Sequence, residues 1–149
     1  MALMAALLSA VWLVAIVTAP LLPTALSAVV YAVGSIVCHQ LPDRSFHLST
    51  FQLPVCARCV GIYAGASVGA VALVMQIGVG ARRVKGTPIM RRGRWLLLAG
   101  ALPTAMTVIL EAAGVWPTTN IVRAVAGFPL GLAAVLVVMS ALATLNYRD

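Results

Sequence analysis

The sequence predicts an all-α integral membrane bundle of about five transmembrane helices. Of the 149 residues, 62% are hydrophobic and only 9% are charged, and the mean hydropathy is +1.07. A water-soluble domain of this composition would expose apolar surface, whereas a lipid bilayer accommodates it. Five apolar runs, separated by prolines, a polar segment and basic residues, fill most of the chain. Residues 1–149 are therefore expected to form a single membrane domain whose surrounding partner is the lipid bilayer.

The first two apolar runs differ in length. Residues 1–19 carry no charged side chain and are long enough to cross a bilayer, and Pro20 and Pro23 then end the run. Residues 24–37 are short for a crossing, which needs about 20 apolar residues. We expect them to form the second transmembrane helix. The alternative is that residues 1–37 form one kinked span or a re-entrant pair.

The third run, residues 54–80, begins with a proline. Proline is favoured in the first turn of a helix because its missing N–H is not needed there. Pro54 therefore predicts that Cys56 lies within the first turn and that Cys59 lies one turn later on the same face.

The last three runs carry helix-packing and anchoring signals. Three glycines at four-residue spacing in the third run predict a groove that another helix can approach closely: Gly61, Gly65 and Gly69. Residues 95–113 and 121–145 are the expected fourth and fifth helices, and Gly127 and Gly131 give the last one a similar surface. Aromatic residues near the helix ends are typical of membrane interfaces: Trp95, Trp116 and Tyr147.

A basic cluster predicts the orientation in the membrane. Six of the ten Lys and Arg residues lie between Arg82 and Arg94. Basic loops are retained in the cytoplasm, so residues 81–94 are expected to form a cytoplasmic loop. The segment 38–59 is then extracytoplasmic, the C-terminus is cytoplasmic and, with five spans, the N-terminus lies outside. The net charge of +7 is thereby explained as a topology signal, and no nucleic-acid partner is expected.

All three cysteines and both histidines lie between residues 38 and 59. Cys38 and His39 are adjacent, and Cys56 and Cys59 form a C-x-x-C pair, which together offer three thiolates and one imidazole. This combination is typical of tetrahedral zinc. Adjacent ligands seldom point the same way, and His47 is therefore the substitute for His39.

Two other uses of the cysteines remain open. A C-x-x-C pair at the start of a helix on the outer face of a membrane suits a thiol-disulfide or quinone-linked redox protein, with Cys38 as a partner thiol. Such proteins generally relay electrons between two dithiol pairs, and this chain has three cysteines. A structural disulfide among the three is the other alternative.

Polar residues elsewhere suggest support for this site. Glu111 and Arg123 fall near the outer ends of the fourth and fifth helices, where pairing would reduce the cost of burying either charge. Asp43, Arg44 and Arg58 suggest a second network, and Gln40 and Tyr63 are expected hydrogen-bond partners around the cysteines.

Two strings, CHQLPDRSF from residue 38 and QLPVCARCVGIYAG from residue 52, resemble the signature of the small bacterial membrane proteins of domain-of-unknown-function family 2085. That signature runs C-H-Q, then R-S-F, then P-x-C-A-R-C-x-G-I-Y-x-G. In the second half, Asn120 and Arg123 resemble an N-x-x-R element, and Thr107 stands where members often carry aspartate. The resemblance implies a multi-pass protein of the bacterial cytoplasmic (inner) membrane and supports Gln40 and Tyr63, but it implies no activity.

These features favour a small membrane protein with a metal site, zinc being the expected ion, at its extracytoplasmic end. The expected ligands are Cys38, His39, Cys56 and Cys59, supported by Gln40, Arg44, Arg58 and Tyr63. The small size and the glycine grooves favour an accessory subunit of a larger membrane complex or a homo-oligomer. Whether the chain is an enzyme is left open by its sequence.

Overall fold

The computed structural model describes residues 2–78 and 88–145, and the elements in these two ranges are helical apart from one small hairpin. Single turns of 3-10 helix, Ala19–Leu21 and Pro42–Arg44, precede α2 and β1. The main elements are α1 (Ala2–Thr18), α2 (Thr24–Val37), β1 (Ser45–Leu48), β2 (Phe51–Cys56), α3 (Ala57–Gly78), α4 (Pro88–Ala112) and α5 (Asn120–Leu145).

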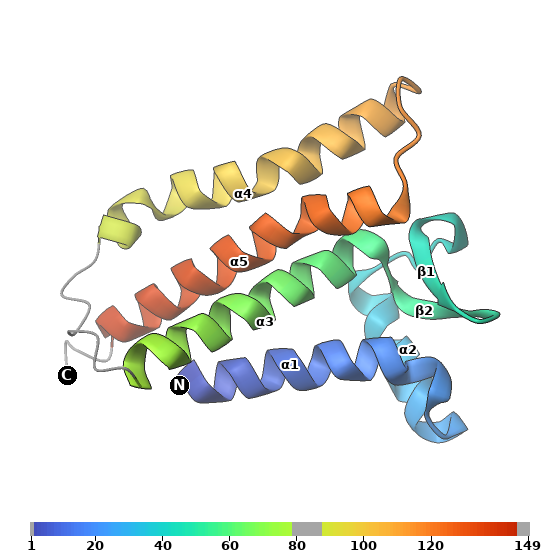
Figure 1. Ribbon diagram of the computed structural model, residues 1–149, viewed down its shortest axis with the longest axis horizontal. Coiled ribbons are helices and arrows are strands. Elements are labelled where there is room, and N and C mark those ends of the chain that lie inside the picture. Colours follow the sequence, from blue (N-terminus) through green and yellow to red (C-terminus); the bar gives the residue numbers. More distant parts are fainter. Residues whose placement is uncertain (1, 79–87, 146–149) are drawn as a thin grey trace.

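The four long helices lie side by side in the order α4, α5, α3, α1 (Figure 1). Four apolar windows long enough to cross a membrane lie along them: Leu3–Leu21, which includes the 3-10 turn after α1, Ala57–Met75, Gly93–Ala112 and Asn120–Leu142. The expected all-α membrane bundle is thereby confirmed. α3 and α5 form the middle of the row, and α1 and α4 form its two edges, where most apolar side chains face outward. In lipid such exposure is favourable rather than costly.

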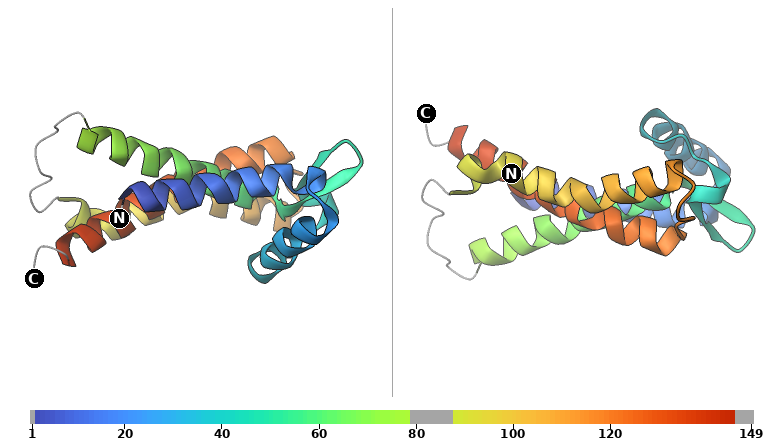
Figure 2. Two further views of the ribbon diagram at one scale, coloured as in Figure 1. Left: turned by 90° about the horizontal axis from the view of Figure 1, so that it is seen from below. Right: turned by 90° about the horizontal axis from the view of Figure 1, so that it is seen from above.

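The prediction of a fifth full span is wrong for α2. Its 14 residues rise about 21 Å, which is shorter than the roughly 30 Å hydrocarbon core. α2 stays at one end of the row beside the hairpin, whereas α1 begins at the opposite end, where α5 finishes (Figure 1, Figure 2). The first and last described helical residues therefore lie at the same end. The start of α1 does not lie at the end that carries the cysteines, and the alternative of one kinked span describes residues 2–37 better.

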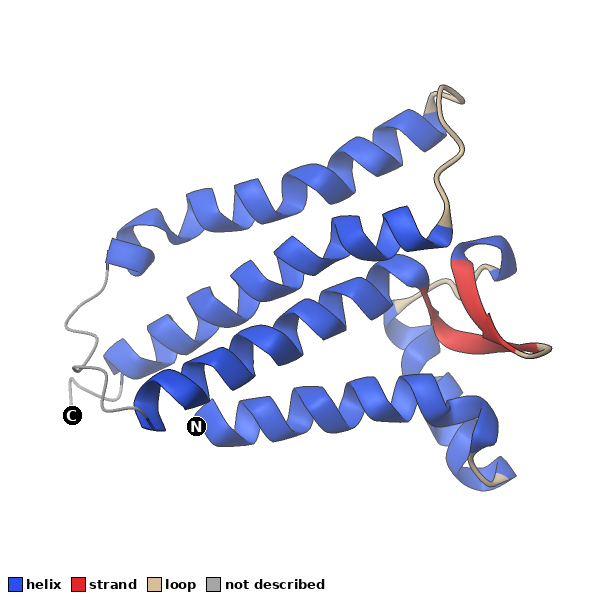
Figure 3. Cartoon of the chain, in the orientation of Figure 1, coloured by secondary structure: helices blue, strands red, loops and turns tan. Residues whose placement is uncertain are grey.

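A two-stranded hairpin, which the sequence analysis did not anticipate, occupies the end of the bundle beside α2 (Figure 3). β1 pairs antiparallel with β2, with Ser45 opposite Cys56 and His47 opposite Gln52, and the ladder is irregular between these pairs. Pro54 lies in this irregular stretch, where its missing N–H breaks no regular pairing. Pro54 therefore belongs to a strand and does not open a helix, and α3 begins three residues later at Ala57.

Backbone contact between α3 and α5 holds the middle of the row together. A Cβ atom at Gly61 would overlap the carbonyl of Ala124, and one at Gly65 would overlap that of Phe128. From the other side, a Cβ at Gly131 would overlap the carbonyl of Ile62. Gly69 meets side chains of Val135 and Leu132 instead. Glycine is therefore required along this contact because any side chain would separate the two backbones.

The expected cytoplasmic basic loop falls largely outside the described residues, which exclude Arg82, Arg83 and Lys85 and the side chains of Arg91 and Arg92. α4 begins at Pro88, so the second half of the predicted loop is helical. Arg94 is exposed, and its guanidinium lies 4.9 Å from the ring centroid of Trp95. A basic residue stacked on tryptophan suits the interface where α4 enters lipid.

Reporter fusions should establish the orientation. A reporter after Lys85 should read cytoplasmic because basic residues are retained there, and one near Ser49 should read extracytoplasmic. A reporter placed before Ala2 should agree with the one after Lys85, because α1 crosses once and α2 does not cross back. Agreement of the N-terminal reporter with the Ser49 reporter would restore the five-span arrangement.

Replacing Gly65 by alanine should destabilise the bundle by about 1–3 kcal/mol, because the added methyl group pushes the α5 backbone away. Gly93→Ala is the matched control, since the nearest atom to its new Cβ would be 3.4 Å away, in ordinary contact. Unfolding of both variants in detergent, followed by circular dichroism, measures the difference. Equal stability of the two variants would show that α3 and α5 do not depend on close approach.

Candidate metal centre

The three cysteines come from three different local structures at one end of the bundle. Cys38 is the C-cap of α2, and its N–H donates to the carbonyl of Gly34. Cys56 is the last residue of β2, and Cys59 lies in the first turn of α3. The end of α2 and the hairpin therefore bring Cys38 to a C-x-x-C pair that is 18 residues further along the chain.

The three sulfur atoms all lie within 4.8 Å of one another. The Sγ atoms of Cys56 and Cys59 are 3.6 Å apart, and the backbone N–H of Cys56 donates to the Sγ of Cys38 over 3.2 Å. Cys38 is buried, and the other two are half-buried. All three are free thiols, so the structure does not contain the disulfide considered above.

The structure does not bring His39 into this cluster. Cys38 has an extended backbone with φ −142° and ψ 138°, and successive side chains of an extended chain point to opposite sides. Cys38 accordingly faces the interior, and His39 is exposed. His47, the substitute, is also exposed. Among the described residues, no fourth His, Cys, Asp or Glu ligand atom joins the three sulfurs.

Apolar and aromatic side chains surround the cysteines. Ile16 of α1 and Val55 of β2 are fully buried and form one cluster with Cys38. Tyr63 and Trp12 pack against this cluster, with their rings edge to face and their centroids 6.2 Å apart. Tyr63 follows Cys59 by one helical turn and so supports the same face of α3. The thiols therefore lie against a largely apolar cluster of side chains.

Gln40 forms hydrogen bonds with α2 and with β2, the two elements that lead to Cys38 and to Cys56. Its Nε2 donates to the carbonyl of Tyr31 over 2.9 Å and to that of Pro54 over 2.7 Å. Its own carbonyl accepts from Nε2 of Gln52 over 2.6 Å. Gln40 has φ 50°, a left-handed conformation that costs energy for a residue with a side chain. These hydrogen bonds offset the strain and hold the segment after Cys38 against the strand that precedes Cys56.

Gln40, Gln52 and Tyr31 also link α2 to the hairpin through hydrogen bonds. The hydroxyl of Tyr31 donates to the carbonyl of Gln52, and Gln52 in turn contacts the Oγ of Ser45. Sequence reasoning missed Tyr31 and Ser45 because neither belongs to a metal-ligand pattern. The alternation of polar and apolar residues around Gln52 was the available signal, since it is typical of a strand.

Three charged side chains join α3, α4 and α5 beside the cysteines. Nη2 of Arg58 lies 2.8 Å from Oε2 of Glu111, and Nε of Arg123 lies 2.7 Å from Oε1. The expected Glu111–Arg123 pair is thus confirmed. The expected network of Arg58 with Asp43 and Arg44 does not form, because Arg58 turns toward Glu111 while the other two are exposed.

Asn120 and Thr107 complete the polar contacts of this end. Asn120 donates to the backbone carbonyl of Ser45 and accepts from Nη1 of Arg123, which ties the start of α5 to the hairpin. Thr107 stands where members of the family that the sequence resembles often carry aspartate. It is buried, and its hydroxyl donates to the carbonyl of Thr104. Its hydroxyl is thus satisfied within α4.

The environment of Cys56 lowers the pKa of its thiol to about 5. The main cause is a hydrogen bond from the thiol of Cys59, which favours the thiolate, and burial opposes it. Smaller contributions come from the backbone N–H of Cys59, the thiol of Cys38 and the N–H of Arg58. Cys56 is therefore a thiolate at neutral pH, the form that binds metals and attacks disulfides.

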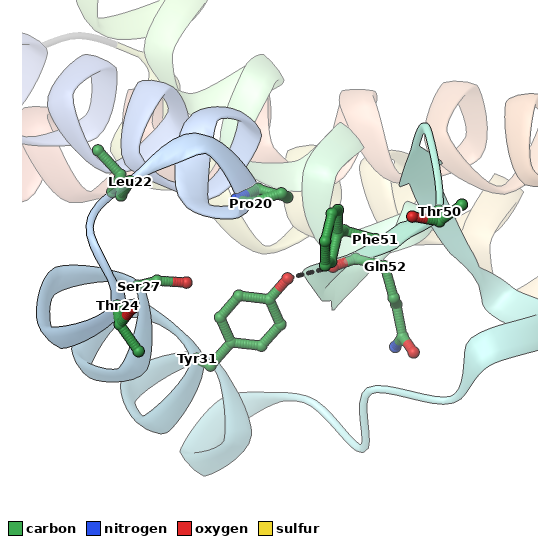
Figure 4. Close-up of a pocket in the computed structure, with 8 residues that line it drawn as sticks. All are labelled: Pro20, Leu22, Thr24, Ser27, Tyr31, Thr50, Phe51 and Gln52. Atoms are coloured by element: carbon green, nitrogen blue, oxygen red, sulfur yellow. Dashed lines mark hydrogen bonds between the residues drawn. The ribbon is translucent and has the colours of Figure 1, made fainter.

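An open groove of about 460 Å³ lies between the α1–α2 connection and the tip of the hairpin (Figure 4). No charged side chain lines it. Its lining combines apolar groups with hydroxyl and amide groups and consists of Pro20, Leu22, Thr24, Ser27, Tyr31, Thr50, Phe51 and Gln52. The cysteines do not line this groove, so it is separate from the cysteine cluster.

Comparisons with known proteins found a family that is described as membrane proteins. The family model described as "Predicted membrane protein (DUF2085)" matches residues 38–137. An uncharacterised protein of Methanocaldococcus jannaschii is 31% identical over 123 residues, covering 83% of this chain and 74% of the relative. One of Methanothermobacter thermautotrophicus is 29% identical over 98 residues, covering 64% and 78%. No solved structure matches.

Both of these relatives are archaeal, so the expectation of a bacterial family is too narrow. The matched region begins at Cys38 and includes the whole hairpin, the cysteines and the Arg–Glu–Arg contacts. The short helix α2 and the first span lie before it.

The reactivity of Cys56 should depend on pH in the reduced, metal-free protein. Because its lowered pKa leaves the thiolate present above about pH 5, the alkylation rate should be constant from pH 6 to 8 and fall below pH 5. Peptide mass mapping of iodoacetamide labelling measures this rate. Cys59→Ala should move the midpoint toward the ordinary thiol value near 8.5, and Cys38→Ala should move it less. A native midpoint near 8.5 would contradict the assigned hydrogen bonds.

Proposed function

Because the chain belongs to the predicted membrane protein family DUF2085 and gathers three thiols at one end of its bundle, we propose that it is a membrane metal-binding protein. The ligands are Cys38, Cys56 and Cys59, and zinc is the expected ion. The observation that carries this proposal is the convergence of three sulfurs from two separate parts of the chain within 4.8 Å.

The spacing of the sulfurs fits a thiolate-bound ion. Zinc held tetrahedrally by thiolates at about 2.3 Å separates its sulfur ligands by about 3.8 Å. Cys56 and Cys59 are 3.6 Å apart, so small side-chain rotations suffice to bring all three sulfurs to that separation. Thiolate sets favour soft or borderline ions, with zinc and copper(I) foremost, over magnesium or calcium.

Three protein ligands leave one position of a tetrahedral ion for another group. Three protein ligands plus an exchangeable fourth are the arrangement of catalytic zinc sites, whereas structural sites use four. His39 supplies the fourth ligand only if the backbone at residues 38 and 39 turns. We therefore assign the fourth position to water, a substrate or a group from a partner subunit. The last of these agrees with the accessory-subunit role in a larger complex or a homo-oligomer.

The bound ion would also act on the fold. Cys38 ends α2, and Cys56 and Cys59 mark the junction of β2 with α3, so one ion ties both ends of the hairpin segment. Binding energy gained at such a site is also folding energy. The basic residues that precede and begin α4 in the sequence favour an extracytoplasmic position for the site in a cytoplasmic membrane, with the C-terminus inside.

A second candidate function is thiol-disulfide exchange. The C-x-x-C sulfurs are 3.6 Å apart, so a disulfide between Cys56 and Cys59 needs little movement. Its formation from two thiols releases two electrons and two protons, which a quinone in the bilayer would accept. With Cys38 as the remaining thiol, the chain has no second pair to receive electrons from a protein substrate.

Cys59→Ser should abolish zinc binding and loosen the hairpin together, because one lost thiolate removes a third of the protein ligands. His39→Ala is the matched control and should retain stoichiometric zinc, since its side chain faces away. Metal content of the purified protein and thermal unfolding with and without chelator measure both effects.

The two candidate functions differ in the state of the native thiols. One zinc per chain with three thiols protected from alkylation supports the metal centre. One disulfide and no metal, found under non-reducing conditions, would replace it with the redox function. Loss of zinc in His39→Ala would instead establish His39 as the fourth ligand.

A further inference from the structure

The Arg58–Glu111–Arg123 cluster carries an unbalanced charge at the site end of the bundle. Two guanidinium groups share one carboxylate, so the net charge of these three side chains is +1. Their side chains are only 13%, 9% and 12% exposed. An uncompensated charge at this degree of burial is costly, and the cost is greater beside a lipid phase.

No second carboxylate among the described residues supplies the missing negative charge. The sequence contains three acidic residues, Asp43, Glu111 and Asp149. Asp43 is exposed and contacts Arg123 through its backbone carbonyl rather than its carboxylate, and Asp149 lies outside the described residues at the end of the chain. In addition, Nε of Arg58 is buried and has no hydrogen-bond partner. The cysteines are the remaining groups at this end that become negatively charged.

The charge of a metal complex depends on the ion. Three thiolates with a divalent ion carry −1, and three thiolates with a monovalent ion carry −2. Arg58 stands between Cys56 and Cys59 in the sequence and lies in the same first turn of α3 as Cys59, so the backbone that carries two of the thiols also carries one of the guanidinium groups. With water as the fourth ligand, the divalent complex and the cluster together are neutral, whereas the copper(I) complex leaves −1.

We propose that the Arg58–Glu111–Arg123 cluster is the counter-charge of the metal centre and selects a divalent ion over a monovalent one. This inference rests on the proposed metal site. The cluster acts through charge, so it determines which ion binds without supplying a ligand. A test must therefore separate its charge from its contacts between helices.

Three variants make that separation. Glu111→Gln raises the cluster charge to +2, Arg123→Gln lowers it to 0, and the double variant returns it to +1 without the Glu111–Arg123 ion pair. Affinities for zinc and for copper(I) are measured on the full chain in detergent, under anaerobic reducing conditions, by competition with chromophoric chelators. Circular dichroism checks that each variant is folded.

The ratio of copper(I) to zinc affinity should follow the charge. One charge added to or removed from the cluster should change this ratio by about tenfold, because charges interact strongly at the effective dielectric constant of a protein interior, near 20. Glu111→Gln should raise the ratio, Arg123→Gln should lower it, and the double variant should return to the native ratio. A purely structural role predicts no such return, because the double variant loses more contacts than either single variant.

The outcomes are separable. An unchanged ratio in Arg123→Gln, or a double variant that resembles it, overturns the charge role while leaving metal binding intact. If Glu111→Gln fails to fold because its two arginines repel, Arg123→Gln and the double variant decide the question alone. A native chain that binds neither zinc nor copper(I) overturns the proposed metal function itself.

Discussion

Backbone contact between α3 and α5 is the constraint on which the rest of the molecule depends. The two backbones approach closely because glycine, which lacks a Cβ, stands at the contact on both helices: Gly61 and Gly65 on α3, and Gly127 and Gly131 on α5. Gly127 rests against the carbonyl of Arg58, in the first turn of α3. The contact therefore fixes the turn that carries Cys59, as well as the distance from Arg58 to the charged groups on the neighbouring helices.

The length of α2 is the second constraint. A helix of 14 residues cannot reach across the bilayer. It therefore stays at the end of the bundle where α1 finishes, which is also the end where α3 begins. Gly34, near its end, allows this proximity, since a Cβ there would collide with the carbonyl of Pro54. Gln40 then bonds to that same carbonyl. A shortened helix, a glycine and a strained glutamine together bring Cys38 to the other two thiols.

Composition and residue spacing predicted much of this structure because they reflect two strong effects, the preference of apolar residues for lipid and the cost of burying polar groups. Hydropathy identified the four long spans, and the C-x-x-C pair with Cys38 indicated where the thiols gather, since each signal is local in sequence. The pairing of Glu111 with Arg123 was predictable because both lie near the outer ends of neighbouring apolar helices, where an unpaired charge is costly to bury. Arg58 was assigned to the wrong partners because Asp43 is nearer in sequence, and the distance to Glu111 depends on how three helices pack.

Local backbone geometry accounts for the remaining errors. Pro54 satisfies the requirements of a helix start and of an irregular strand equally well, so the residue alone does not distinguish them. The outward direction of His39 follows from the extended conformation of Cys38, which no residue type in that segment dictates.

The ion pairs of Arg58 also have a consequence for how the chain is made. Glu111 follows Arg58 by 53 residues, and at about 5–20 residues per second its synthesis comes roughly 3–10 s later. During that interval Arg58 is a cation without its carboxylate. Its place in the first turn of α3, rather than in the middle of the span, keeps it within reach of interfacial water until α4 arrives. If Arg58 lay one or two turns further into α3, an arginine without a carboxylate partner would have to be inserted into the hydrocarbon core of the membrane.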